Sequence, residues 1–137
     1  MTAGESLQQF GLPPSDEALP RIRELLAAEA EAERCGRPRE EDLALLCCVQ
    51  LFSRALPEDI LRIWDAKCAS VDLGDYLDAD LLCGGGLDAA KKFLAASSGA
   101  AAAAALAHLV GREKLGHFDG FSPDGSLRNY RRYFKLE

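Results

Sequence analysis

The feature that most constrains the fold of this chain is an apolar run from Leu43 to Phe52, in which the only strongly polar side chain is Gln50. The run falls far short of the roughly 20 residues that cross a bilayer as a helix. Pro38 and three acidic residues precede it, as is typical of a helix start, where the helix dipole favours negative charge. A helix that is apolar almost all round is normally the buried centre of a bundle. The sequence therefore predicts a central helix over about 38–55.

The composition predicts an all-α fold around this central helix. The 137 residues include 22 Ala and 22 Leu, but only three Val, three Ile and one Thr. Ala and Leu are the best helix formers, whereas the β-branched residues that suit a strand are nearly missing. No repeat with the period of a helical solenoid is visible. We therefore expect a compact orthogonal bundle of five to seven helices.

Helix starts, turns and breakers divide the chain into three parts. Residues 1–14 read as a loose N-terminal arm, residues 15–118 as the helical domain, and residues 119–137 as a C-terminal tail packed on that domain. Within the domain we expect helices over about 15–36, 38–55, 57–68, 76–82, 87–96 and 100–116, with a loop through Gly74. The tail places Leu127, Tyr130 and Phe134 on one helical face, although an irregular or extended tail docked by its aromatic side chains fits almost as well.

The five cysteines, Cys35, Cys47, Cys48, Cys68 and Cys83, read as structural thiols. Their number is odd, most of them lie in or beside apolar segments, and neither CxxC nor a zinc-ligand spacing occurs. Cys68 is expected on the inner stripe of its helix. Together with an N-terminus that lacks the pattern of a secretion signal, this usage predicts a cytoplasmic protein. The excess of Arg over Lys and the abundance of Ala hint at a GC-rich bacterial genome.

Charge is distributed unevenly along the chain, whose formal net charge is −6. Residues 1–80 carry 17 acidic and 8 basic side chains, whereas residues 81–137 carry 5 acidic and 8 basic ones. Nucleic-acid binders usually present a basic face, so the acidic majority argues against nucleic acid as a partner. Electrostatic attraction instead favours a basic protein partner.

The first candidate contact surface combines aromatic, basic and acidic side chains in the middle of the chain. Its members are Trp64, Lys67, Asp72, Asp75, Tyr76, Asp78 and Asp80. Trp and Tyr are enriched at the centres of protein interfaces, although a single Trp on an apolar stripe is more often a core residue. The four aspartates lack the calcium-loop pattern and are more typical of caps and solvated loops, so no metal is predicted.

The second candidate surface is the arginine- and tyrosine-rich tail, comprising Arg128, Tyr130, Arg131, Arg132 and Tyr133. Such a mixture suits contact with an anion, a nucleic acid or a protein. It equally suits an internal clamp over the acidic first eighty residues, which is the simpler interpretation. The run from Gly84 to Gly86 lacks the residues of a phosphate-binding loop and reads as a tight corner between helices.

These observations favour a non-catalytic domain that acts by protein–protein binding. By analogy alone, its small size and acidity suit an immunity-protein-like or antitoxin-like neutraliser or regulator of a basic partner. The alternative is an enzyme, metal-dependent or acting on another small molecule, with a pocket near the aspartates from Asp72 to Asp80. We expect no cofactor and no membrane association, and we assign no catalytic residue, because neither His108 nor His117 lies in a recognisable catalytic motif.

Overall fold

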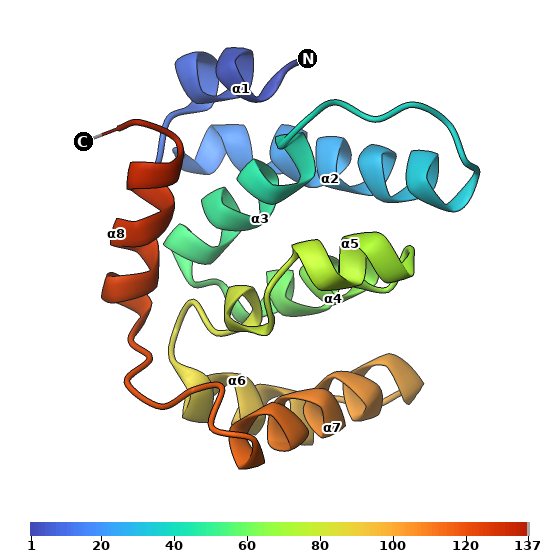
Figure 1. Cartoon of the computed structure of the whole chain (residues 1–137), viewed down its shortest axis with the longest axis vertical. Helices are drawn as coiled ribbons and strands as arrows, with labels where there is room; N and C mark the ends of the chain where they lie inside the picture. The colour runs from blue at the N-terminus through green and yellow to red at the C-terminus, as the bar shows by residue number, and fades with distance from the viewer. Residues whose placement is uncertain (137) are drawn as a thin grey trace.

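The computed structural model describes residues 1–136, and over this range all regular secondary structure is helical, with no strand (Figure 1). Its α-helices are α1 (Ala3–Phe10), α2 (Leu19–Arg34), α3 (Leu43–Arg54), α4 (Ile60–Lys67), α5 (Val71–Tyr76), α6 (Leu87–Ala96), α7 (Ala100–Lys114) and α8 (Pro123–Tyr133). Three short 3-10 helices lie between them, over Asp16–Ala18, Pro57–Asp59 and Ala79–Leu82. The all-α bundle is confirmed. The eight α-helices of the described range exceed the five to seven predicted, because short helices form in two segments expected to be irregular.

The central position of α3 is confirmed, since every residue from Leu43 to Phe52 is buried. Helix α2 packs along α3, and α1, α8 and the 3-10 helix Ala79–Leu82 also contact it. The predicted start near Pro38 is wrong, because residues 37–42 form a connection rather than a first turn. Asp42 adopts the left-handed conformation, with φ of 62°, so the helix begins only at Leu43.

Burial separates the five cysteines into two groups. Cys47, Cys48 and Cys83 are buried, and burial raises the pKa of the Cys47 and Cys83 thiols to about 12, where a thiol is a poor nucleophile. Cys35 and Cys68 are exposed and follow the last residues of α2 and α4. The expected inward position of Cys68 is therefore wrong, because α4 ends at Lys67 and Cys68 follows it as an exposed capping residue.

The N-terminal segment forms helix α1 where a loose arm was expected. Thr2 and Glu5 make reciprocal capping hydrogen bonds: the Glu5 N–H donates to Thr2 Oγ1 at 3.1 Å, and the Thr2 N–H donates to Glu5 Oε1 at 2.9 Å. Gln50 of α3 then donates from Nε2 to the Gly11 carbonyl at 3.0 Å, which ties the end of α1 to the core. The Gln50 that interrupts the apolar run is thus the polar attachment point of α1.

The segment between α4 and α6 also differs from expectation. Helix α5 covers residues 71–76 and includes Gly74, because Ser70 caps it by accepting the Leu73 N–H on Oγ at 3.0 Å. Leu77 is extended and ends the helix, so the predicted helix over 76–82 is reduced to the 3-10 helix Ala79–Leu82. Leu73, Leu77 and Leu81 nevertheless point into the core.

The tail is helical and lies beside the end of α3 and the N-terminal part of the chain (Figure 1). Ser122 caps α8, and Leu127, Tyr130 and Phe134 pack against the core as the helical pattern predicts. No residue of α8 is fully buried, in contrast to α2 and α3. Within residues 1–136, none of the helices has the length and apolarity to span a membrane.

Candidate functional site

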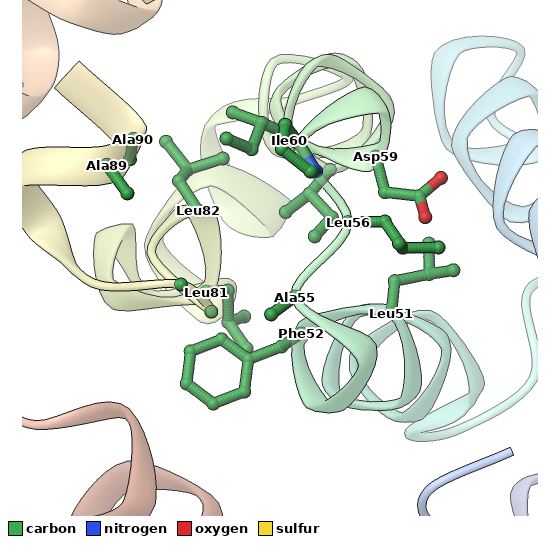
Figure 2. A pocket seen from close by; sticks show the side chains of 14 residues that line it. Leu51, Phe52, Ala55, Leu56, Asp59, Ile60, Leu81, Leu82, Ala89 and Ala90 are labelled. Atoms are coloured by element: carbon green, nitrogen blue, oxygen red, sulfur yellow. The ribbon is translucent and has the colours of Figure 1, made fainter. Parts of the chain in front are cut away.

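A small apolar cavity lies where α3 turns into α4, closed by α6 and the 3-10 helix Ala79–Leu82 (Figure 2). Leu51, Phe52, Leu82 and Ala90 are among the side chains around it, and Figure 2 shows the Asp59 carboxylate turned away from Ala90. Its volume of about 50 Å³ admits at most a few water molecules and is far below the several hundred cubic ångströms of a metabolite site. The hollow opens to the surface at the exposed Ala55, Gly85 and Ala89 and is too small to hold a metabolite.

A much larger open groove lies on the surface where four separate segments meet: α1, the connection 37–42, α5 and α8. It consists of two hollows, of about 510 and 550 Å³, that share Glu40, Glu41, Asp42 and Tyr133. The first hollow is also lined by Arg39, Asp72 and Tyr76; the second also by Thr2, Ala3, Gly4, Leu7, Phe134 and Lys135. We call the two hollows together the tyrosine groove.

Asp42 lies at the centre of the tyrosine groove and joins its two sides. The Tyr133 hydroxyl of α8 donates to the Asp42 carboxylate, with O···O distances of 2.9 and 3.0 Å, and the Tyr76 hydroxyl of α5 donates to the same carboxylate. Burial, followed by the hydrogen bond to Asp42, raises the pKa of Tyr76, so this hydroxyl stays protonated as a donor. Both rings remain exposed, Tyr76 at 42% and Tyr133 at 52%. The groove thus presents two tyrosine rings held at fixed positions beside a carboxylate.

Hydrogen bonds to α2 hold the connection that carries Glu40, Glu41 and Asp42. The Glu40 N–H donates to the buried Glu29 carboxylate at 3.0 Å, and the Arg37 N–H donates to the Ala32 carbonyl at 2.8 Å. Arg39 pairs with Glu33, which also accepts a hydrogen bond from Ser70 at 2.9 Å. The connection is therefore held by several independent contacts. Arg39 lines the first hollow, but its guanidinium pairs with Glu33, which lies outside the groove.

The electrostatic character of the groove is acidic. Glu40, Glu41, Asp42 and Asp72 contribute four carboxylates, against Lys135 at one end and the paired Arg39. Glu40, Glu41 and Asp72 are exposed. Carboxylates beside partly exposed tyrosines are suited to a guanidinium or ammonium group, which gains charge pairing and can contact a ring.

The residues of the first predicted surface do not lie together in the structure. Asp72 and Tyr76 line the tyrosine groove, whereas Asp75 and Asp78 are exposed without lining it. Lys67 is buried and donates to the backbone carbonyls of Gly74 and, at 2.5 Å, Leu77, which holds α5 against α4. Burial lowers the pKa of this Lys67 ammonium. Lys67 is therefore a structural residue.

The remaining two members of that surface also make internal contacts. Trp64 packs on the His108 ring of α7 at a centroid distance of 5.3 Å and lies against the core. Asp80 accepts hydrogen bonds from Ser126 at 2.9 Å and Tyr130 at 3.2 Å, both in α8. Burial raises the pKa of Asp80. Within residues 1–136, no group of three or more His, Cys, Asp and Glu side chains is arranged to hold a metal ion.

The second predicted surface acts largely as the internal clamp. Tyr130 donates to Asp80, Arg131 donates to the Leu12 carbonyl at 2.8 Å, and Tyr133 reaches Asp42. Arg128 and Arg132 are exposed, and Arg132 donates to Asn129 Oδ1 of its own helix at 3.4 Å. Tyr133 is the member of this set that belongs to both the clamp and the tyrosine groove.

His108 supplies a pH-dependent contribution to stability away from the groove. Its Nε2 is buried and has no hydrogen-bond partner among residues 1–136. Burial, followed by the charges of Lys67 of α4, Arg112 of α7 and His117 beyond α7, lowers its pKa below the ordinary 6.5. The unfolded chain therefore takes up the proton first, and the free energy of unfolding should fall as the pH decreases below 6.5. Thermal unfolding of the wild type and His108→Gln between neutral pH and the onset of carboxylate titration tests this. His108→Gln should lose the slope, whereas His117→Gln removes only the smallest cause of the lowered pKa and should keep most of it; equal slopes in all three proteins would contradict the assignment.

No protein-family model, curated protein or solved structure matches this chain, so the geometry of the groove carries the functional argument. Sequence reasoning missed Glu40, Glu41 and Asp42 as site residues, because it placed them in the first turn of the central helix. Three consecutive acidic residues directly after Pro38 and Arg39 were the available signal.

Proposed function

We propose that this chain is a protein-binding domain that captures a basic segment of a partner protein in the tyrosine groove. The observation that carries the proposal is the arrangement around Asp42, where Tyr76 and Tyr133 are held with exposed rings among four carboxylates. Tyrosine is enriched at the energetic centres of interfaces, and acidic rims accelerate the capture of basic partners. Covering a basic surface of the partner would neutralise or regulate it, as the immunity-like analogy expects.

The direct test uses a fluorescent oligo-arginine peptide as the probe and anisotropy as the readout. The wild-type chain should bind the peptide, and the affinity should fall as salt is added, since exposed charges are screened. The triple variant E40Q/E41Q/D72N should bind about tenfold more weakly and with a smaller salt dependence.

A matched control separates the groove from the overall negative charge. The triple variant E17Q/E24Q/D88N removes the same number of exposed carboxylates outside the groove and should change the affinity by no more than about twofold. Equal weakening in both variants would show that the peptide responds only to net charge, and the proposal would fail.

A further inference from the structure

The attachment of α8 has a consequence for the tyrosine groove, because α8 supplies one of its walls. Tyr133, Phe134 and Lys135 come from α8 and the residues after it, whereas the opposite wall comes from α1, the connection 37–42 and α5. If α8 leaves the surface, the groove loses Tyr133 and Asp42 loses one of its two donors. The groove is complete only while α8 is docked.

Helix α8 is held on the bundle mainly by contacts near the protein surface rather than by deeply buried side chains. None of its residues is fully buried, although Leu127, Tyr130 and Phe134 rest against the core. Polar contacts hold it at three places along its length: Ser126 and Tyr130 on Asp80, Arg131 on the Leu12 carbonyl, and Tyr133 on Asp42. Helices with little buried surface are the first to open in the native state.

The segment that joins α7 to α8 is suited to such an opening. Leu115 is 79% exposed, and Gly116 and Gly120 adopt positive φ values of 82° and 74°. Glycine reaches these conformations without the cost that a side chain would add. Gly116 and His117 are hydrogen-bonded to the last turn of α7, and Phe118 packs against the core, so the freedom to move α8 lies mainly at Gly120. The connection therefore provides a hinge between the bundle and α8.

We infer that α8 is a hinged strap whose docking is coupled to occupancy of the tyrosine groove. A ligand that contacts Tyr133 together with Asp42 binds the docked form and not the open one, so it shifts the population towards docking. By the same linkage, anything that releases α8 lowers the affinity of the groove. This inference rests on the proposed function, since it concerns the regulation of the same site.

Hydrogen exchange of the full chain, with and without the oligo-arginine peptide, measures this coupling. If only the docked form binds, opening is suppressed by the factor 1 + [peptide]/Kd, so peptide at about ten times Kd slows exchange in α8 by about tenfold. The informative amides are those of Leu127 and Arg128, which lie towards the Asp80 end of α8 and do not line the tyrosine groove. Amides of α6 that exchange by local fraying provide the internal reference and should be unaffected, since those openings leave the groove intact.

A second arm loosens α8 without touching the groove. The double variant S126A/Y130F removes both donors to Asp80 and should accelerate exchange in α8 by about tenfold in the absence of peptide, with exchange slowed again when peptide is added. Ser98→Ala, at an exposed turn before α7, is the matched control and should behave as the wild type.

The outcomes of these measurements distinguish a failure of the hinged strap from a failure of the proposed function. Peptide binding that leaves exchange in α8 unchanged would overturn the hinged strap while leaving the proposed function intact. A wild-type chain that fails to bind the peptide would remove the proposed function, and the coupling with it. Faster exchange in S126A/Y130F spread over the whole chain would show that α8 opens only with global unfolding, which also contradicts the inference.

Discussion

Replacing Arg23 by alanine is expected to lower the free energy of unfolding by about 3 kcal/mol, because it leaves a buried carboxylate without its main partner. Asp59 is 1% exposed, and Arg23 of α2 donates to it twice, from Nε at 2.8 Å and from Nη2 at 3.0 Å. This bidentate pair joins α2 to the start of α4. A loss of this size is a large fraction of the 5–15 kcal/mol that stabilises a typical domain.

Urea denaturation measures this free energy of unfolding, and two other arginine variants serve as controls. Arg62 also donates to Asp59, at 3.0 Å, but its side chain is 46% exposed, so Arg62→Ala should cost about 1 kcal/mol or less. Arg21 pairs with Glu24 entirely at the surface, and Arg21→Ala should change stability by less than about 0.5 kcal/mol. An Arg23→Ala variant as stable as Arg21→Ala would show that Asp59 does not depend on its buried partner.

Features determined by local sequence were predictable. The apolar run from Leu43 to Phe52 required burial on all sides, and α3 lies at the centre of the bundle. The boundaries of α6 and α7 follow from glycine and serine breaks on either side of strong helix formers, and the structure places both where they were expected. In these elements, local preference and tertiary packing favour the same conformation.

The tyrosine groove was not predictable in this way, because it is assembled from segments far apart in the chain. Tyr76 and Tyr133 contact Asp42 although they are 34 and 91 residues away from it in the sequence. Contacts over such separations leave no periodic pattern in the sequence. The left-handed conformation of Asp42 also has no marker in the sequence, since its neighbours Glu41 and Leu43 are compatible with a helix. Helix α1 had a local signal, the Thr2 and Glu5 capping pair, which the prediction overlooked; only its attachment through Gln50 was beyond local reasoning, which treats that residue as an interruption of the apolar run.

Substitution of Gly84 is also expected to have a large effect on stability, because the corner at this residue has no space for a side chain. A Cβ built on Gly84 would lie 2.4 Å from the Phe52 carbonyl oxygen and 3.2 Å from two further backbone atoms of Phe52. Backbone atoms of the buried helix α3 cannot yield as a flexible side chain would. Gly84→Ala is therefore expected to destabilise the protein by about 3 kcal/mol, at the upper end for overpacking a core.

The adjacent glycine supplies the matched control for Gly84→Ala in the same unfolding measurement. A Cβ on Gly85 would meet only Ala55 and Ala89, each at 3.9 Å, which is ordinary van der Waals distance. Gly85→Ala should therefore leave the protein as stable as the wild type or stabilise it by about 0.5 kcal/mol, since alanine restricts the unfolded chain. Similar stabilities of the two variants would mean that the corner can move away from α3. A large difference would establish that the first glycine of the run is required by the close approach of two backbones, and that the corner needs no bound phosphate to explain it.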